Sequence, residues 1–209
     1  MYLPAHFAET DAAEVAALMA AFPLACLVAA TPEGLVANHL PLLVGPDGAL
    51  IGHVALANDV HRLVAEGQEV MAVFRGEEAY VSPNLYPSKA VHHRHVPTWN
   101  YQAVHVHGPI AFRHDEKAKR AAVGLLTREH ERRLNGDAAW RMADAPADYL
   151  TGMLANIVAF RIEVRRVIAK AKLSQNREPA DFAGVVESLE ARGRETMVAR
   201  MRRIAEARD

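Results

Sequence analysis

The chain has 209 residues and a formal net charge of −1, from 24 lysines and arginines against 25 aspartates and glutamates. This length allows one large domain with or without a helical appendage, and the balanced charge argues against strong global binding to nucleic acid. The single Cys26 excludes an intrachain disulfide, and no apolar run is long enough to span a bilayer. The first residues lack a basic segment followed by an apolar one, so we expect no signal peptide and a cytoplasmic location.

The N-terminal segment predicts a helix followed by a buried strand. Asp11 and Glu14 resemble a capping box, and the residues after them have apolar side chains at helical spacing. Pro23 ends this helix, because the residue before a proline avoids helical backbone angles. The apolar run "LACLVAAT" at 24–31 then predicts the first strand.

A hairpin and a short helix are expected next. The run 35–44 predicts a second strand, and a proline near its end indicates an edge strand or a bulge. The turn "GPDG" at 45–48 joins it to a third strand at 49–55. Asn58 or Asp59 can cap the short helix that follows.

The middle of the chain predicts further strands around a long loop. Residues 69–76 and 77–82 are strand-like and are joined by a tight connection, and residues 101–112 alternate between apolar and polar side chains. Between them, residues 84–99 show no period and contain several turn-forming residues, so we expect a loop. Long loops of this kind are often functional.

The C-terminal third predicts two helical regions separated by a strand. Helices are expected at 115–133 and over the tail from 179 to 206, and the alternation at 157–169 predicts a strand. Six or seven strands joined by turns, with helices between some of them, indicate a mainly β fold: a small antiparallel split barrel with peripheral helices and a helical C-terminal tail. We expect a barrel domain over 1–178 and a helical extension over 179–209, packed on the same domain or on a dimer partner.

Five of the eleven histidines lie between positions 90 and 108, namely His92, His93, His95, His105 and His107. His105 and His107 point to the same face of a strand and can hold a metal if a third ligand converges with them. A haem ligand and a polar face that lines a cofactor are the other interpretations. Residues 79–114 contain no aspartate or glutamate that could orient metal ligands, so we expect no metal site.

The same stretch carries positive charge without a counter-charge. Lys89, Arg94 and Arg113 are its only fully charged residues, and several serines, threonines and tyrosines accompany them. Phosphate groups prefer such donors, and a planar ring prefers an aromatic neighbour such as Trp99. A rigid, proline-braced loop without a ligand is the alternative. The residues alone therefore indicate a phosphate-bearing ligand of unspecified kind.

An ordered series of segments resembles the PaiB-like family of FMN-binding split-barrel proteins. The segments are "MYLPAHFAETD", "LVANHLPLLV", "GHVALAN", "AYVSPNLYPSK", "VPTWNYQAVHVHG", "LLTREHE" and "KLSQNR", from residue 1 to about 190. "VSPNLYPSK" together with "VPTWNY" is the most specific part. The resemblance implies a fold related to the pyridoxamine-phosphate oxidases, a homodimer, and FMN at the subunit interface. Members of the family are labelled transcriptional regulators.

The resemblance also implies where the cofactor contacts lie. The residues expected to contact FMN are Asn38, His39, His53, Asn58, Arg62, Tyr80, Ser82, Lys89, Thr98, Trp99, Asn100, Lys172, Gln175 and Arg177. Of these, Lys172, Gln175 and Arg177 are expected to reach across the dimer, although "KLSQNR" can also be a polar strand exit. The list contains four lysines and arginines, namely Arg62, Lys89, Lys172 and Arg177. At least two of these four cations are expected to approach the phosphate.

Three functions remain open from the sequence. The first is a transcriptional, negative regulator or flavin-dependent sensor, the second an FMN-dependent oxidoreductase with a nicotinamide donor, and the third a haem-binding split barrel. No catalytic residues are predicted, because flavin chemistry needs no side-chain acid or base. DNA is a possible partner only through the tail from Arg192 to Asp209, which has six arginines against three acids and is equally a solvated helix face.

Overall fold

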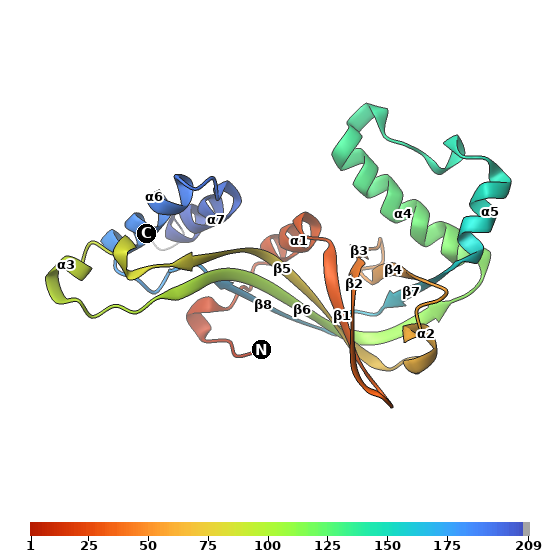
Figure 1. Cartoon of the computed structure of the whole chain (residues 1–209), viewed down its shortest axis with the longest axis horizontal. Helices are drawn as coiled ribbons and strands as arrows, with labels where there is room; N and C mark the ends of the chain where they lie inside the picture. Colours follow the sequence, from red (N-terminus) through yellow and green to blue (C-terminus); the bar gives the residue numbers. More distant parts are fainter. Residues whose placement is uncertain (207–209) are drawn as a thin grey trace. The chain divides into compact units, whose positions relative to one another are not determined.

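The computed structural model describes residues 1–206 of the chain (Figure 1). Eight strands form one antiparallel sheet in the order β2-β1-β5-β6-β7-β4-β3, and β8 pairs with β6. The strands are β1 (Leu24–Thr31), β2 (Gly34–Pro41), β3 (Leu43–Val44), β4 (Leu50–Ala55), β5 (Glu69–Val81), β6 (Thr98–Arg113), β7 (Ile157–Ile162) and β8 (Arg166–Lys172). The predicted mainly β, antiparallel split-barrel class is confirmed.

Seven α-helices and four short 3-10 helices accompany the sheet in the described residues. The α-helices are α1 (Ala12–Ala21), α2 (Val60–Leu63), α3 (Lys89–His92), α4 (Glu116–Asn135), α5 (Ala147–Ala155), α6 (Pro179–Glu190) and α7 (Glu195–Glu206). The 3-10 helices are η1 (Ala5–Phe7), η2 (Pro83–Leu85), η3 (Gly136–Ala138) and η4 (Met142–Asp144). No helix within residues 1–206 is long and apolar enough to cross a membrane.

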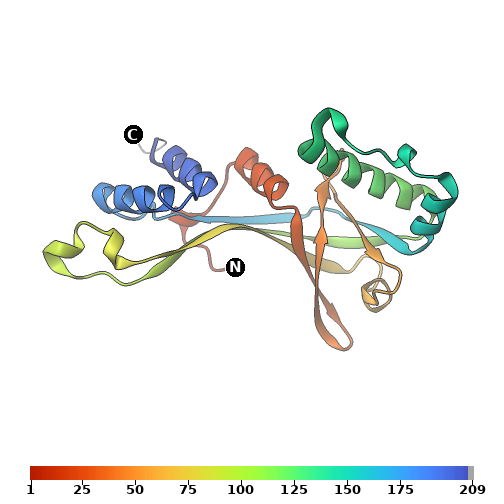
Figure 2. The same cartoon turned by 45° about the horizontal axis from the view of Figure 1, so that its top comes forward.

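The chain forms two compact units, and each is described here by itself. Unit 1 contains Met1–Leu18, Arg75–Val104 and the chain from Ile168 onward, and unit 2 contains Met19–Phe74 and His105–Val167. In unit 1, α6 and α7 lie side by side on one face of the strands (Figure 2). Their apolar side chains pack with those of β5 and β8 into a core that includes Val81, Leu173, Leu189 and Met201.

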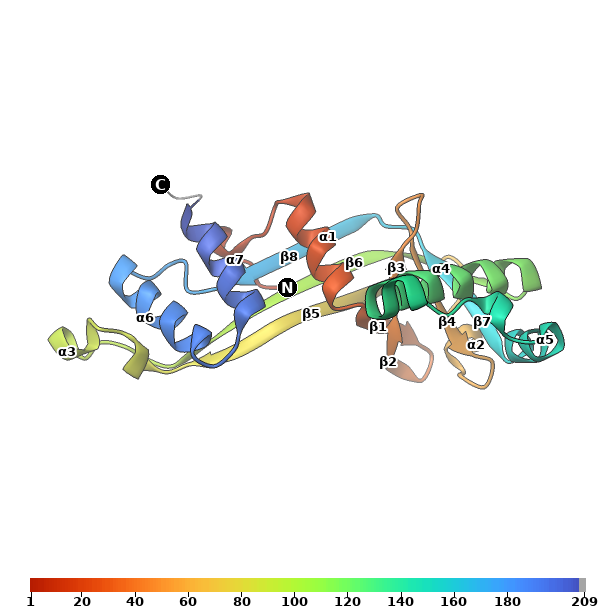
Figure 3. The same cartoon turned by 90° about the horizontal axis from the view of Figure 1, so that it is seen from above.

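In unit 2, the strands supply buried core residues, and the long helix α4 packs against β4 and β7. Leu27, Leu50, Phe74 and Phe160 are almost fully buried there. Figure 3 shows α4 alongside β4 and β7. Asp115 caps the start of α4, since its Oδ1 accepts a hydrogen bond of 2.9 Å from the amide of Ala118. The helix predicted over 115–133 is thus confirmed.

Several predicted boundaries are wrong in ways that have a local cause. The run 35–44 is two strands rather than one, because Pro41 has no N–H and the amide of Leu42 bonds instead to the carbonyl of Pro23 at 2.9 Å. Residues 69–81 are one continuous strand, not two. The run 157–169 divides into β7 and β8, since the amides of Glu163 and Arg165 bond to β6 outside the regular ladder.

The loop predicted over 84–99 contains part of η2 and the short helix α3, and β6 already begins at Thr98. Thr98, Trp99 and Asn100 are therefore strand residues and not loop residues. At the other end of the chain, α1 begins after Asp11, whose Oδ1 accepts from the amide of Ala13 at 2.8 Å. The second half of the predicted capping box is absent, because Glu14 instead pairs with two arginines of α7.

The helical tail predicted from 179 is confirmed as α6 and α7, which pack on strands of the same unit. The division into a domain of residues 1–178 and an extension of residues 179–209 stays a prediction. The last three residues of that extension, 207–209, lie outside the described part of the chain. The helix α5 has only nine residues and was not predicted.

Candidate functional site

The exposed aromatic side chains of unit 1 form the first part of the candidate site. Trp99 on β6 and Tyr80 on β5 are 50% and 47% exposed, and their rings meet edge to face with centroids 5.8 Å apart. A cleft of about 560 Å³ beside them is lined by Arg75, Glu78, Trp99 and Tyr101. Large aromatic side chains that are left half exposed provide apolar surface for a planar ligand.

A partly buried lysine lies next to this aromatic surface. The Nζ of Lys172, at the end of β8, donates to the hydroxyl of Thr98 and to the carbonyl oxygen of Trp99, the latter at 2.9 Å. Burial lowers the pKa of Lys172, and the neighbouring charges of Lys170 and Arg177 lower it further. Within residues 1–206, no carboxylate forms an ion pair with any of these three cations. Such a cluster of positive charge favours the binding of an anion.

The turn after β8 holds this cluster in place. Ser174 has a left-handed backbone with φ of 64° and donates its hydroxyl proton to the side chain of the fully buried Asn100 at 3.0 Å. Gln175 closes the turn on itself, accepting from the amide of Leu173 at 2.7 Å and donating to the carbonyl of Ala171 at 2.5 Å. The polar groups of Asn100 and Gln175 are therefore hydrogen-bonded to other groups of the protein.

Arg177 ends the same turn above an aromatic ring. Its guanidinium lies 4.7 Å from the centroid of the Tyr86 ring, a cation–π contact, and burial raises the pKa of the Tyr86 hydroxyl. This hydroxyl is buried without a hydrogen-bond partner in the described structure. Within residues 1–206, Arg177 has no ion pair with a carboxylate, so its charge is available to an anion.

The remaining two predicted residues of unit 1 serve the local chain. Ser82 caps η2 by accepting from the amide of Asn84 at 3.2 Å. Lys89 donates to the side-chain oxygen of Asn84 at 2.5 Å. Unit 1 thus contains nine of the fourteen predicted contacts: Tyr80, Ser82, Lys89, Thr98, Trp99, Asn100, Lys172, Gln175 and Arg177.

The other five predicted contacts lie in unit 2. Asn38 on β2 accepts a hydrogen bond of 2.7 Å from the side chain of Asn58, whose own oxygen accepts from the amide of Val60 at the start of α2. The guanidinium of Arg62 forms an ion pair with the carboxylate of Asp59 at 2.8 Å. His39 is exposed and lies on the opposite face of β2 from Asn38.

His53 is the member of this second group that lacks a partner. It lies on β4, and its Nδ1 is buried with no hydrogen-bond partner in the described structure. Burial lowers the pKa of His53, which keeps the ring neutral near neutral pH. A neutral imidazole with a free buried nitrogen matches a neutral ligand group that donates or accepts a hydrogen bond.

The five clustered histidines separate into two groups. His105 and His107 lie on β6 with ring centroids 6.5 Å apart, and burial lowers the pKa of each. His95 lies against Ser88 at 2.7 Å, and Ser88 also donates to Asp181 at 2.7 Å. Across residues 1–206, no three histidine, cysteine or acidic side chains are grouped so that they could hold a metal ion. His92 and His93 are exposed.

Tyr101 belongs to the stretch 79–114 whose tyrosines were expected to accompany the cations, whereas Arg75, Glu78 and Asp181 were not predicted. Tyr101 lines the same cleft as Trp99 because the two residues are two apart on one strand, and this alternation is visible in the sequence. No pattern in the sequence identifies Arg75, Glu78 or Asp181, because each reaches its group through the pairing of segments that are far apart in the chain.

Loss of stability in acid is the first expected result of this geometry. The pKa of His53 is below its unfolded value of about 6.5, so the unfolded chain binds more protons, and the free energy of unfolding should fall as the pH decreases through 6.5. Urea unfolding of the protein and of a His53→Asn variant between pH 8 and pH 5 measures this. The variant should lose less stability in acid than the parent. The same change at exposed His93 is the control, and an unchanged pH dependence in His53→Asn would contradict the assignment.

The comparisons with known proteins agree with this chemistry. The family model described as "Putative FMN-binding domain" matches residues 1–166. The Protease synthase and sporulation protein PAI 2 of Bacillus subtilis is 31% identical over 194 residues, which cover 91% of this chain and 89% of the relative.

Two solved structures share the fold. The FAD- and haem-binding protein of Mycobacterium smegmatis aligns with a TM-score of 0.60 at 17% identity, over 78% of this chain and 72% of the other. The flavocytochrome Anf3 of Azotobacter vinelandii aligns with a TM-score of 0.55 at 16% identity, over 85% of this chain and 75% of the other. At these identities the likeness establishes the architecture.

Proposed function

The chain belongs to the family of FMN-binding domains, and from this premise we propose that it is a homodimeric flavoprotein that acts as a flavin-dependent sensor in transcriptional control. The resemblance to the PaiB-like family is confirmed, and FMN is its cofactor. Bound FMN supplies reversible electron transfer, while the protein supplies binding and polarity.

The observation that carries the cofactor assignment is Lys172. Its ammonium is held beside the Thr98 hydroxyl, next to Trp99 and without a carboxylate partner in the described chain. A phosphate dianion matches this donor set, because charge-assisted hydrogen bonds from an ammonium and a hydroxyl offset the cost of burying it. We assign Lys172, Thr98 and Arg177 to the phosphate and the Trp99–Tyr80 surface to the ring.

His53, Asn38 and Asn58 of unit 2 are the second set of proposed contacts. Their uncharged donors and acceptors suit the polar edge of a flavin, which carries carbonyl oxygens and an N–H. In a homodimer, Lys172 and Arg177 can serve the FMN that is bound mainly by the other subunit. This would place the cofactor at the interface.

The sensor role is favoured by the relative. The Bacillus subtilis relative is named for protease synthesis and sporulation, which are regulated processes. Direct binding of DNA through the tail is not part of the proposal, because Arg200 and Arg203 pair with Glu14 and Arg202 pairs with Glu190. Arginines that are already paired with carboxylates neutralise fewer phosphates of DNA.

The visible spectrum of the purified protein tests the cofactor assignment. A flavin band is expected, whereas a Soret band would favour the haem alternative. That alternative is supported by the similarity to a haem-binding protein and by the histidine content.

Anaerobic addition of NADH or NADPH then distinguishes the two flavin roles. If the flavin absorption band bleaches slowly and no electron acceptor is turned over, the result supports a sensor. If the band bleaches rapidly and an electron acceptor is turned over, the result supports an FMN-dependent oxidoreductase.

A dimer in solution is the second expected result. Leu24 and Leu35 of the β1–β2 hairpin are 64% and 80% exposed, and exposed apolar side chains of this size are commonly covered by a symmetric partner. Sedimentation velocity at micromolar concentration should give the mass of two chains. Leu35→Glu should shift the protein toward the monomer, whereas Val91→Glu on α3, which is 82% exposed, should not. A monomeric parent protein would contradict the interface site.

A further inference from the structure

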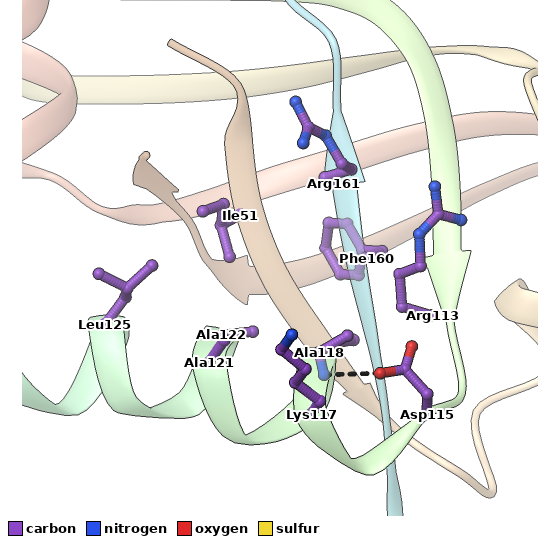
Figure 4. A pocket seen from close by; sticks show the side chains of 11 residues that line it. Ile51, Arg113, Asp115, Lys117, Ala118, Ala121, Ala122, Leu125, Phe160 and Arg161 are labelled. Atoms are coloured by element: carbon purple, nitrogen blue, oxygen red, sulfur yellow. Dashed lines mark hydrogen bonds between the residues drawn. The ribbon is translucent and has the colours of Figure 1, made fainter. Parts of the chain in front are cut away.

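A second cleft lies within unit 2, between α4 and the strands β4 and β7. Its volume is about 390 Å³, which is within the range of small-molecule sites. The floor is apolar: Figure 4 shows Ile51 of β4, Phe160 of β7 and Leu125 of α4 around it, with the alanines of the helix alongside. No group of the proposed FMN site lines this cleft.

The rim of the cleft carries three cations. Arg113, Lys117 and Arg161 line it, against one acid, Asp115. Asp115 already accepts a hydrogen bond from the amide of Ala118, shown by the dashed line in Figure 4. Glu66 and Asp47, which do not line the cleft, pair with Arg113 and Arg161, so the rim cation that has no ion pair within residues 1–206 is Lys117.

The cations keep donors free for a ligand. Arg113 pairs with Glu66 at 3.2 Å and Arg161 with Asp47 at 2.8 Å, each through a single nitrogen. A guanidinium has five N–H donors, so both retain donors after these contacts. Lys117 is exposed and has no hydrogen bond or ion pair within residues 1–206. It is the cation of the rim that is least engaged by the protein.

We propose that this cleft binds a small aromatic carboxylate. An aromatic ring matches the floor of Ile51, Phe160 and Leu125, because it buries apolar area without needing hydrogen bonds. The carboxylate matches Lys117 and the free edge of Arg113 or Arg161, since charge-assisted hydrogen bonds are the strong ones. A neutral ligand of the same shape would lose the second contribution, and a short aliphatic acid would lose the first.

The probe is 4-phenylbutyrate, titrated into the FMN-loaded protein by calorimetry and followed by ligand-observed NMR. A ligand of this size is expected to bind with a Kd of about 0.1–1 mM. The amide 4-phenylbutyramide and the acid butyrate are the matched ligands, and each should bind at least about threefold more weakly. Addition of FMN should not displace the probe.

Two variants and one control locate the binding. Ala121→Phe places a ring in the cleft from an exposed helix position and should abolish binding. Lys117→Ala should weaken binding about three- to tenfold, whereas Arg128→Ala, which removes an exposed cation from the same helix outside the cleft, should not. The proposal is overturned if the parent protein does not bind the probe, if Ala121→Phe binds it normally, if the amide binds equally well, or if FMN competes with it.

Discussion

Replacing Lys172 with methionine is expected to weaken FMN binding by about one to two decades, or about 1.5–3 kcal/mol. Methionine keeps most of the apolar stem but removes the ammonium that lies against Thr98 and Trp99. The phosphate would then lose its charged donor while remaining buried, which is the costly case. Fluorescence titration of the apoprotein with FMN measures the change.

Lys170→Met is the matched control for this experiment. Lys170 lies two residues earlier on β8, but its ammonium donates to the carbonyl of Tyr2 at 3.1 Å and lies over the rings of Tyr2, Phe7 and Tyr101. Its loss should affect FMN affinity much less than the loss of Lys172. Lys172→Arg should retain most of the affinity. Equal losses in the two methionine variants would show that Lys172 acts through general charge or stability and not through contact.

The protonation of Lys172 gives the same site a pH signature. Because burial and the charges of Lys170 and Arg177 lower the pKa of Lys172, its charge is lost at a lower pH than that of an ordinary lysine. FMN affinity should therefore fall as the pH rises through that lowered pKa, and Lys172→Arg should remove the fall. An identical alkaline decline in the arginine variant would assign the effect to another group.

Replacing Arg200 with methionine is expected to lower the free energy of unfolding by about 3 kcal/mol. Arg200 of α7 is only 13% exposed and pairs with Glu9 and with Glu14, the latter at 3.2 Å. Removal of the guanidinium leaves two poorly solvated carboxylates, of which Glu14 keeps an ion pair with Arg203 and Glu9 keeps only the amide of Asp11. Urea denaturation measures the loss.

Arg202→Met is the control, because it removes the same side chain from the same helix. Arg202 pairs with Glu190 at 2.8 Å, but the two side chains are 54% and 53% exposed. Exposed pairs contribute about 0–1 kcal/mol, since solvent screens them and the side chains lose entropy on pairing. Similar losses in the two variants would contradict the role of Arg200 in fixing α7 to the N-terminal segment.

The parts of the fold that the sequence predicted are those encoded by neighbouring residues. The apolar run of β1 gave its exact bounds, Leu24–Thr31, and Asp115 marked the beginning of α4. Boundaries failed where a distant segment decides the outcome. The break at Leu42 depends on a hydrogen bond to Pro23, and the gap between β7 and β8 depends on bonds to β6.

The candidate site divides in the same way. Residue types and the ordered motifs identified Lys172, Thr98 and Trp99 as members of one cofactor site. They could not show that Lys172 contacts Thr98, because 74 positions separate the two residues and only the packing of β8 beside β6 brings them together. Nor could they show which cations are already engaged: Arg62 pairs with Asp59, while Lys172 has no carboxylate partner in the described chain.

The most direct test of the proposed site is a parallel titration of the apoprotein with FMN and with riboflavin, which differ only in the phosphate. If Lys172, Thr98 and Arg177 hold a buried phosphate, FMN should bind at least about 100-fold more tightly than riboflavin. That difference should shrink to about tenfold or less in Lys172→Met. Equal affinity of the parent protein for the two flavins would show that these residues do not bind the phosphate.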